Sequence, residues 1–337
     1  MRPAPRASPS AERANDEKSR DARPGRSVVA TTARQVRVVV TCTLRKSSPV
    51  PRSLRLRAVS GVRLSTRFRH WTERLANAEV PPRPALDLYA GEHWTMARRL
   101  ADEPHTATTI DLWVCSAGYG LIPANTPIVP YSATFAPRSP DSVPEPVTDW
   151  WAALGDWGGP AKGPRRLVDL AASDPSARYL FVLSAAYLGA CHHDVCQAAE
   201  KLSGSGRLSV ISAGTKRDRD LADVLLPADA RLQAVLGGTL QALNIRAAEH
   251  LLRAGLVDHD DMADGLRRLL AEQPPPRRFN RRQISDAEIR AFVRARRRVE
   301  PHVTHTRLLR ELRAANYACE QARFATLFAA ETKKIGR

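Results

Sequence analysis

The chain has 337 residues, of which 43% are hydrophobic, enough for a sizeable core and more than one ordinary domain. It carries 52 Lys or Arg against 35 Asp or Glu, a formal net charge of +17. No run of about eighteen apolar residues occurs, the first residues lack the apolar segment of a signal peptide, and the five cysteines are an odd number. We therefore expect a cytoplasmic protein without a membrane span and exclude a secreted disulfide scaffold.

The first 34 residues are rich in Arg, Ala, Pro and Ser and show no hydrophobic periodicity. Such a segment cannot bury enough surface to offset its ordering entropy, so residues 1–34 are predicted to be a disordered basic tail. Translation from an upstream start codon accounts for this segment equally well.

Short apolar runs indicate the strands of an α/β domain over residues 35–272. Val36–Thr43 is β-branched and apolar, as in a buried parallel strand. Three further runs each contain a Ser-Ala pair at the end, namely Leu112–Ala117, Leu180–Ala185 and Leu208–Ala213. Ser116, Ser184 and Ser212 are expected at the carboxyl ends of strands, where they either permit a tight turn or line one pocket.

Helical spacing separates these runs, which predicts a mostly parallel or mixed sheet with flanking helices. A region at 218–256 is broken by Pro227 and by Gly237-Gly238, so it should form two or three helices. The other predicted helices are Ser65–Glu79, Glu92–Asp102, Val168–Ala172, Asp194–Leu202 and Asp260–Ala271.

A Pro- and Arg-rich linker at 273–283 precedes a small all-helical domain at 284–337. Ser285 begins a capping-box pattern for a helix that Pro301 ends. Thr304 or Thr306 can cap a second helix, and a turn at 314–318 leads to a third over Cys319–Lys333. The last two helices predict a helix-turn-helix, and a generic three-helix bundle is the alternative.

Residues 274–337 hold 16 Lys or Arg and 6 Asp or Glu, a net +10. Concentrated positive charge favours a polyanion through counterion release, so double-stranded DNA is the expected partner. An anionic membrane fits less well, because the segment lacks an apolar stripe with aromatic anchors. The expected DNA contacts are Arg310, Arg313, Gln321 and Arg323, with Glu320 also on the recognition helix.

Gly118 and Gly120 flank Tyr119 directly after a predicted strand, so the backbone there can bend around a ligand and offer amides to an anion. The pattern is neither a phosphate-binding Gly-Lys-Ser/Thr loop nor a dinucleotide fingerprint.

Four motifs in chain order resemble the YaaA-like superfamily, which includes peroxide-stress proteins. They are Thr-Cys-Thr-x-Arg-Lys (41–46), Leu-Tyr-x-Gly-x-x-Trp (88–94), Ser-Ala-x-Tyr-Gly-Leu-Ile (116–122) and Pro-Tyr-x-x-Thr (130–134). The resemblance covers roughly residues 36–143 and implies a DNA-associated α/β domain. Gly118 stands where many relatives carry Lys. The chain is also similar to phage-defence DNA glycosylases that remove glucosylated hydroxymethylcytosine.

Cleavage of an N-glycosidic bond needs a carboxylate that activates water or stabilises an oxocarbenium-like cation. Asp141 is the first candidate and Glu92 the second, with Asp87 also in the region; each is alternatively a turn former or a helix cap. Tyr119 and Tyr131 are expected to stack on an extruded base. The full expected substrate-binding set is Arg45, Lys46, Tyr89, Gly91, Ser116, Gly118, Tyr119, Gly120, Tyr131 and Ser132. Arg45 and Lys46 would contact a phosphate, unless they form a solvated turn.

The Cys191–Cys196 segment, Cys-His-His-Asp-Val-Cys, is interpreted as the start of a helix. Its Cys-x4-Cys spacing is longer than a zinc knuckle and no second pair lies nearby, so we expect neither a metal site nor a cofactor. A serine hydrolase is excluded because Gly-x-Ser-x-Gly is absent.

The leading hypothesis is a DNA glycosylase that excises modified bases in antiphage defence. The alternative is a non-catalytic DNA-binding or DNA-protecting protein, and an enzyme acting on RNA bases is a third possibility.

Overall fold

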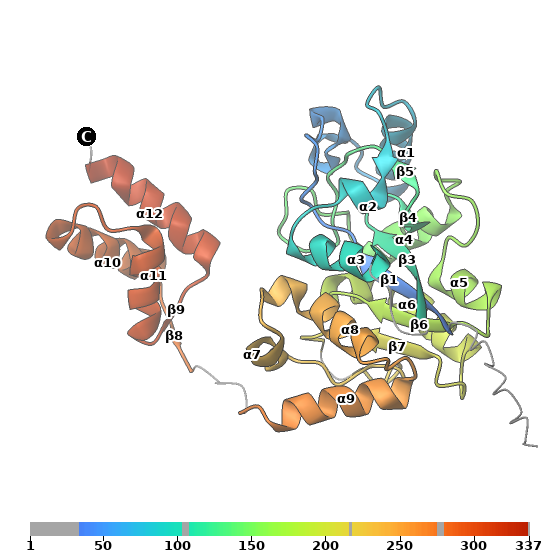
Figure 1. Ribbon diagram of the computed structural model, residues 1–337. Helices are drawn as coiled ribbons and strands as arrows, with labels where there is room; N and C mark the ends of the chain where they lie inside the picture. Colours follow the sequence, from blue (N-terminus) through green and yellow to red (C-terminus); the bar gives the residue numbers. More distant parts are fainter. Residues whose placement is uncertain (1–33, 103–107, 216–217, 275–279, 336–337) are drawn as a thin grey trace, which may run out of the picture.

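The computed structural model describes residues 34–102, 108–215, 218–274 and 280–335 (Figure 1). The tail predicted over 1–34 lies outside the described residues except for Arg34. Within the described ranges, none of the helices combines the length and the apolar character that crossing a bilayer requires.

A five-stranded sheet with the order β4-β3-β1-β6-β7 forms the centre of the α/β domain. All neighbours are parallel except β3 and β4, which form an antiparallel hairpin. The strands are β1 (Arg34–Thr41), β3 (Thr108–Ser116), β4 (Gly120–Pro123), β6 (Arg178–Val182) and β7 (Leu208–Ile211). β1 is central and Val36, Val38, Val39 and Val40 are fully buried, as expected of a strand covered on both faces.

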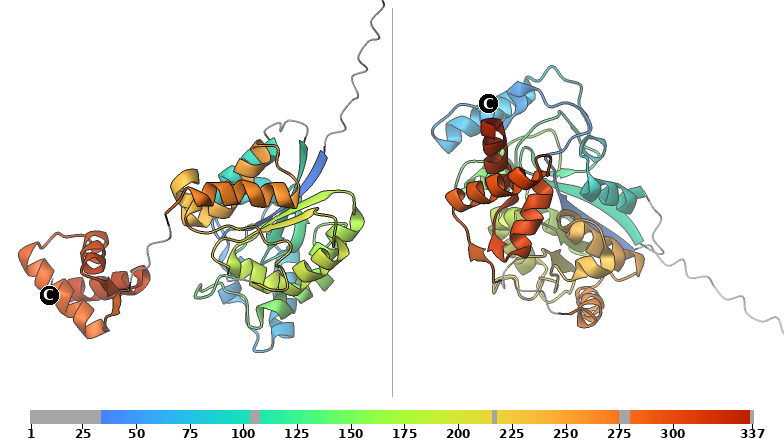
Figure 2. Two further views of the ribbon diagram at one scale, coloured as in Figure 1. Left: turned by 90° about the horizontal axis from the view of Figure 1, so that it is seen from below. Right: turned by 90° about the vertical axis from the view of Figure 1, so that its left-hand side faces the viewer.

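Helices cover both faces of this sheet, as the left view of Figure 2 shows. One layer contains α3 (Glu92–Asp102), α8 (Leu243–Arg253) and α9 (His259–Ala271). The other contains α4 (Val147–Asp156), α5 (Leu167–Ser173) and α6 (Ala185–Lys201). The predicted α/β class with a mixed sheet is therefore confirmed.

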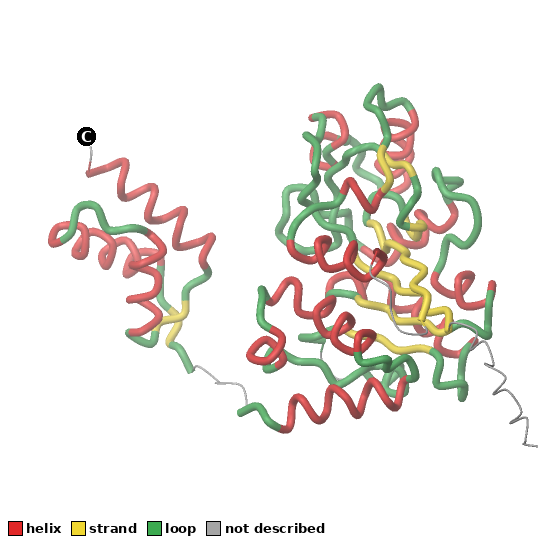
Figure 3. The backbone as a smooth tube through the Cα atoms, in the orientation of Figure 1, coloured by secondary structure: helices red, strands yellow, loops and turns green. Residues whose placement is uncertain are grey.

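Further elements complete the domain around the sheet (Figure 3). They are η1 (Arg52–Leu54), η2 (Leu56–Ala58), α1 (Leu64–Ala76), α2 (Ala85–Leu88), α7 (Leu232–Leu236) and η3 (Leu240–Ala242). A small antiparallel pair joins β2 (Arg83–Pro84) to β5 (Pro127–Ile128).

Two local predictions were wrong. Residues 118–120 do not form an open binding loop, because Gly120 pairs with Ser116 at the start of β4. The segment Cys191–Cys196 is not the start of a helix but lies in the middle of α6, which begins at Ala185.

A second hydrophobic core, separate from that of the α/β domain, is formed by the C-terminal residues. It joins α10 (Asp286–Val299), α11 (His305–Ala314) and α12 (Gln321–Ile335) through side chains such as Ile289, Leu308 and Phe324. Ser285 forms the predicted capping box with Glu288, and Thr304 caps α11.

The C-terminal unit begins slightly earlier than predicted. Residues 275–279 of the expected linker lie outside the described part of the chain, but Asn280 accepts a hydrogen bond from Asn316 Nδ2 at its backbone oxygen. The unit is also not entirely helical, because β8 (Arg282–Gln283) pairs with β9 (Tyr317–Ala318) in the turn between α11 and α12.

One buried carboxylate joins α12 to α10. The side chain of Glu331 is 1% exposed, and its two oxygens accept hydrogen bonds from Arg290 and Arg294, each at 3.0 Å. Replacing Glu331 with Ala leaves two half-exposed guanidinium groups without these bonds, so we expect a loss of about 2–3 kcal/mol in the stability of the C-terminal unit.

Urea unfolding measures this effect separately for the two units. All six tryptophans lie between Trp71 and Trp157, so their fluorescence reports on the α/β domain, whereas circular dichroism reports on both. E331A should shift only the dichroism signal. The exposed pair of Glu300 with Arg307 provides the control, because E300A should cost less than about 1 kcal/mol. Equal effects of both variants would show that Glu331 has no special role.

Candidate active site

The turn between β3 and β4 is held by side chains that satisfy its backbone. Ser116 Oγ accepts hydrogen bonds from the amides of Gly118 (3.2 Å) and Tyr119 (3.0 Å). The indoles of Trp150 and Trp71 donate to the carbonyls of residues 117 and 118, at 2.9 and 3.0 Å. The two turn amides are therefore occupied, which corrects the expectation that they bind an anion.

Gly118 is required by the close approach of an aromatic ring. A Cβ atom at this position would lie 2.4 Å from Tyr131 Cε2, far inside van der Waals contact. This chain therefore has no room for a side chain at position 118, because the Tyr131 ring occupies the space.

Hydroxyl groups and an amine gather at this carboxyl edge of the sheet. The hydroxyl of Tyr131 lies 2.7 Å from Ser116 Oγ and 2.9 Å from the hydroxyl of Tyr89. Lys46 Nζ lies 4.5 Å from the centre of the Tyr131 ring and 4.9 Å from that of Tyr89. The predicted residues Lys46, Tyr89, Ser116, Gly118 and Tyr131 are thus brought together.

Lys46 is folded back onto its own loop instead of extending into solvent. Its Nζ donates to the backbone oxygen of Thr43, and part of its side chain stays accessible. Burial of the amine lowers the pKa of Lys46 from 10.5 to about 8. A substantial fraction of this amine is therefore neutral near physiological pH, which an ordinary surface lysine does not offer.

The loop that carries Lys46 is fastened to the segment before α3. Ala90 donates its amide to the backbone oxygen of Arg45 at 3.0 Å, and Ser47 donates its amide to Leu88 at 2.8 Å. The side chain of Arg45 is exposed and lies beside Gly91. The Arg45 side chain can thus bind a phosphate, whereas the Lys46 side chain is not oriented to do so.

The tyrosines do not present open stacking faces. Tyr89 and Tyr131 are completely buried, and burial raises the pKa of each hydroxyl well above 10, so both stay protonated. The expectation that Tyr131 stacks on an extruded base does not fit this burial. Tyr119 differs, because its ring and that of Trp157, 6.0 Å apart, line an apolar hollow of about 340 Å³.

Asp141 has structural partners on both of its oxygens. Oδ1 accepts the amide of Arg57 at 3.0 Å, and Oδ2 accepts the hydroxyl of Ser132 at 2.8 Å. The side chain is 7% exposed. These contacts tie the loop after Tyr131 to η2, so the residue predicted first as the catalytic carboxylate fastens a loop.

Glu92 is likewise used for tertiary structure. It pairs with Arg246 of α8 at 2.7 Å and accepts the amide of Thr239, and these bonds lower the pKa of its carboxyl group. Asp87 is exposed in α2. Among the described residues, the Glu92 carboxylate accepts its hydrogen bonds from Arg246 and Thr239 and not from the cluster around Lys46.

Three of the four predicted DNA contacts line one hollow of about 490 Å³ in the C-terminal unit, namely Arg310, Arg313 and Gln321. Arg310 is exposed and has no ion pair among the described residues, whereas Arg313 donates to the backbone oxygen of Cys319. Arg323 lies elsewhere, where it pairs with Asp286 and donates to the backbone oxygen of Ile284 at 2.9 Å.

Comparisons of the chain with protein-family models, curated proteins and solved structures found no match.

The packing of Tyr131 on Gly118 can be tested with a single added methyl group. G118A must displace the Tyr131 ring, so we expect a loss of about 1–3 kcal/mol in the stability of the α/β domain, measured by tryptophan fluorescence in urea.

Gly189 is the matched control, because it lies in α6 with no atom within 4 Å of an added Cβ. G189A should be neutral or stabilise by up to about 1 kcal/mol, since alanine favours a helix. If G118A were as stable as the wild type, the ring could move at no cost and the cluster would not be rigid.

Proposed function

We propose that the protein is a DNA-processing enzyme that breaks N-glycosidic bonds, with Lys46 as its nucleophile. The observation that carries the proposal is the amine of Lys46, whose pKa is lowered to about 8 and which lies over two buried tyrosine rings at the carboxyl edge of the sheet. Ligands of open α/β sheets bind at this edge. A neutral lysine amine is a recognised nucleophile that forms imines with substrates.

The reaction balances without a cofactor. The bond from Lys46 Nζ to C1′ of the deoxyribose forms as the bond from C1′ to the base nitrogen breaks, and the base leaves with its bonding electrons. One amine proton ends on the released base and the other on O4′ as the sugar ring opens. The product is an imine between Lys46 and C1′, which water hydrolyses to regenerate the amine.

The other residues of the cluster position this amine. Nζ lies over the rings of Tyr89 and Tyr131, and their protonated hydroxyls bond to each other and to Ser116. Arg45, which is exposed next to Lys46 in the chain, supports a phosphate contact. In this proposal Asp141 holds a loop and takes no part in the chemistry.

The positive charge of the C-terminal unit supports the same proposal. Its excess of arginine favours binding to a polyanion, because binding releases counterions from the polyanion. The hollow lined by Arg310, Arg313 and Gln321 offers hydrogen-bond donors to phosphates or to the edges of bases. The resemblance to YaaA-like proteins and to phage-defence glycosylases agrees with a DNA substrate whose bases are modified.

A non-catalytic DNA-binding protein is the second candidate. It is favoured by the complete burial of Tyr89 and Tyr131 and by the internal partners of Asp141, which a purely structural centre also has.

Lys46→Met should abolish covalent trapping. Purified protein is incubated with unmodified, hydroxymethylated or glucosylated phage DNA in the presence of borohydride, which reduces the imine to a stable amine. We expect a protein–DNA adduct with the wild type, none with K46M, and base release reduced by about 100-fold or more. Because the neutral amine attacks, the rate should rise with pH and level off above about 8.

Two further variants test whether the trapped adduct depends on Lys46 itself. K162M removes an exposed lysine and should leave the adduct unchanged. D141N should keep activity wherever the loop stays folded. Base release that survives K46M but is lost in D141N would return catalysis to the carboxylate, and DNA binding without release on any of the three DNAs would favour the second candidate.

Arg310→Gln should weaken DNA binding without unfolding the C-terminal unit, since Arg310 has no ion pair among the described residues. The slope of log affinity against log salt should fall in magnitude by about 1, because one phosphate contact is lost. R323Q is the contrast, since Arg323 holds Asp286 and should lower stability. An unchanged salt slope in R310Q would place the DNA elsewhere.

A further inference from the structure

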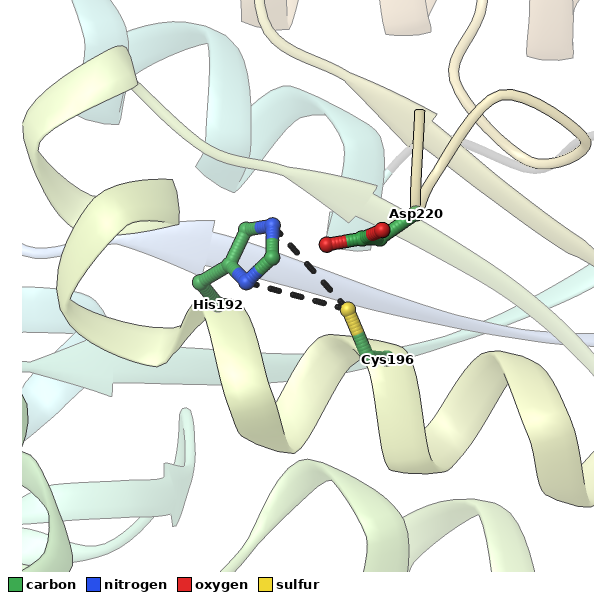
Figure 4. Close-up of side chains that lie close together, drawn as sticks. All are labelled: His192, Cys196 and Asp220. Atoms are coloured by element: carbon green, nitrogen blue, oxygen red, sulfur yellow. Dashed lines mark hydrogen bonds between the residues drawn. The ribbon is translucent and has the colours of Figure 1, made fainter. Parts of the chain in front are cut away.

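A second cluster of chemically active side chains lies on α6, away from the residues of the proposed glycosylase site. His192 and Cys196 are four residues apart, so they lie on the same face of this helix. Asp220 comes from the loop after β7. Figure 4 shows the three side chains converging, and one ligand atom from each lies within 4.8 Å of the other two.

The separation of these atoms suits one tetrahedral ion. Cys196 Sγ lies 3.8 Å from His192 Nδ1. Zinc bonds of about 2.3 Å to sulfur and about 2.0–2.1 Å to nitrogen, at a tetrahedral angle, place those two atoms roughly 3.6 Å apart. A single ion therefore needs only a small shift of either side chain.

A further carboxylate orients the histidine. Asp218 Oδ2 lies 2.8 Å from His192 Nε2, and Asp218 Oδ1 accepts the amide of Asp220 at 3.0 Å. When Nε2 donates its proton to Asp218, Nδ1 keeps a lone pair that can bind a metal ion, and Cys196 Sγ lies 3.8 Å from Nδ1 and 4.0 Å from Nε2. Metal-binding histidines usually have such a carboxylate partner, which fixes the ring and its tautomer.

The surroundings favour a cation and leave room for further ligands. Asp220, Asp223 and Glu200 line the same cavity as Cys196, so the site carries negative charge. A positive ion offsets this negative charge. The cluster lines a cavity of about 820 Å³, so water or a small molecule can complete the coordination.

We propose that His192, Cys196 and Asp220 bind one divalent transition-metal ion of the zinc class, with Asp218 as the residue that orients His192. A nitrogen, sulfur and oxygen ligand set favours zinc, cobalt or nickel over magnesium and calcium, which prefer oxygen alone. Three protein ligands leave one position that faces the cavity, as in zinc sites that hold water. This site does not depend on the proposed glycosylase function.

Cobalt(II) titration of the metal-free full-length protein tests the site. A cobalt–thiolate bond gives an intense charge-transfer band in the near ultraviolet, and tetrahedral cobalt gives visible bands. We expect one equivalent of cobalt to produce both signals and zinc to displace them. Elemental analysis should then find one zinc per chain.

Variants assign the ligands. C196S should lose the charge-transfer band, and H192Q and D220N should each bind cobalt at least about 10-fold more weakly. D218N should keep the band but weaken binding by about 10–100-fold, as other residues that orient metal ligands do. His193 and Asp223 line the same cavity, so H193Q and D223N are matched controls that should bind as the wild type does.

Circular dichroism of each variant without metal confirms that it is folded, and tryptophan fluorescence detects any change in the α/β domain. The proposal is overturned if the wild type gives no charge-transfer band, if folded C196S retains it, or if H193Q weakens binding as much as H192Q. A band retained in C196S, or weakened binding by H193Q, would mean that cobalt binds elsewhere. A missing band in the wild type would mean that His192 and Asp218 form only an ion pair.

Discussion

The hydroxyl group of Ser116 fixes the geometry of the candidate active site. Its oxygen accepts the amides of Gly118 and Tyr119 and lies 2.7 Å from the hydroxyl of Tyr131, with which it shares a hydrogen bond. Tyr131 is then held against Gly118 and under the amine of Lys46. A short chain of contacts thus runs from the end of β3 to the loop after β1, and each member is positioned by the one before.

Much of the fold could be predicted because its strands are buried on both faces, and an apolar run such as Val38–Val40 is typical of such a strand. The sequence does not reveal α4, because its Trp150-Trp151 pair lies between Pro- and Gly-rich stretches that resemble loops. It does not reveal β4 either, because glycines on both sides of Tyr119 are equally typical of a ligand-binding loop and of a hairpin turn.

Residue types at the site were predictable, but their partners were not. Glu92 is neutralised by Arg246, which is 154 residues away in the chain, and Asp141 is saturated by residues 84 and 9 positions earlier. The sequence alone shows where a carboxylate stands in the chain, but it does not show which groups donate hydrogen bonds to it. The same limit hides the α6 cluster: the His-x3-Cys spacing is present in the sequence without a second cysteine pair, and the folded chain supplies Asp218 and Asp220 instead.

The two proposed sites lie at opposite ends of the sheet. The loop after β1 presents Arg45 and Lys46 at the carboxyl edge, whereas residues 224–226 run parallel to β7, so Asp220 and Asp223 before them lie toward its amino end. A DNA backbone that approaches the carboxyl edge is attracted by Arg45 and Lys46. A divalent ion bound by Asp220 offsets negative charge at the other end, so metal binding at α6 and base release at the carboxyl edge are separate properties that can be lost independently.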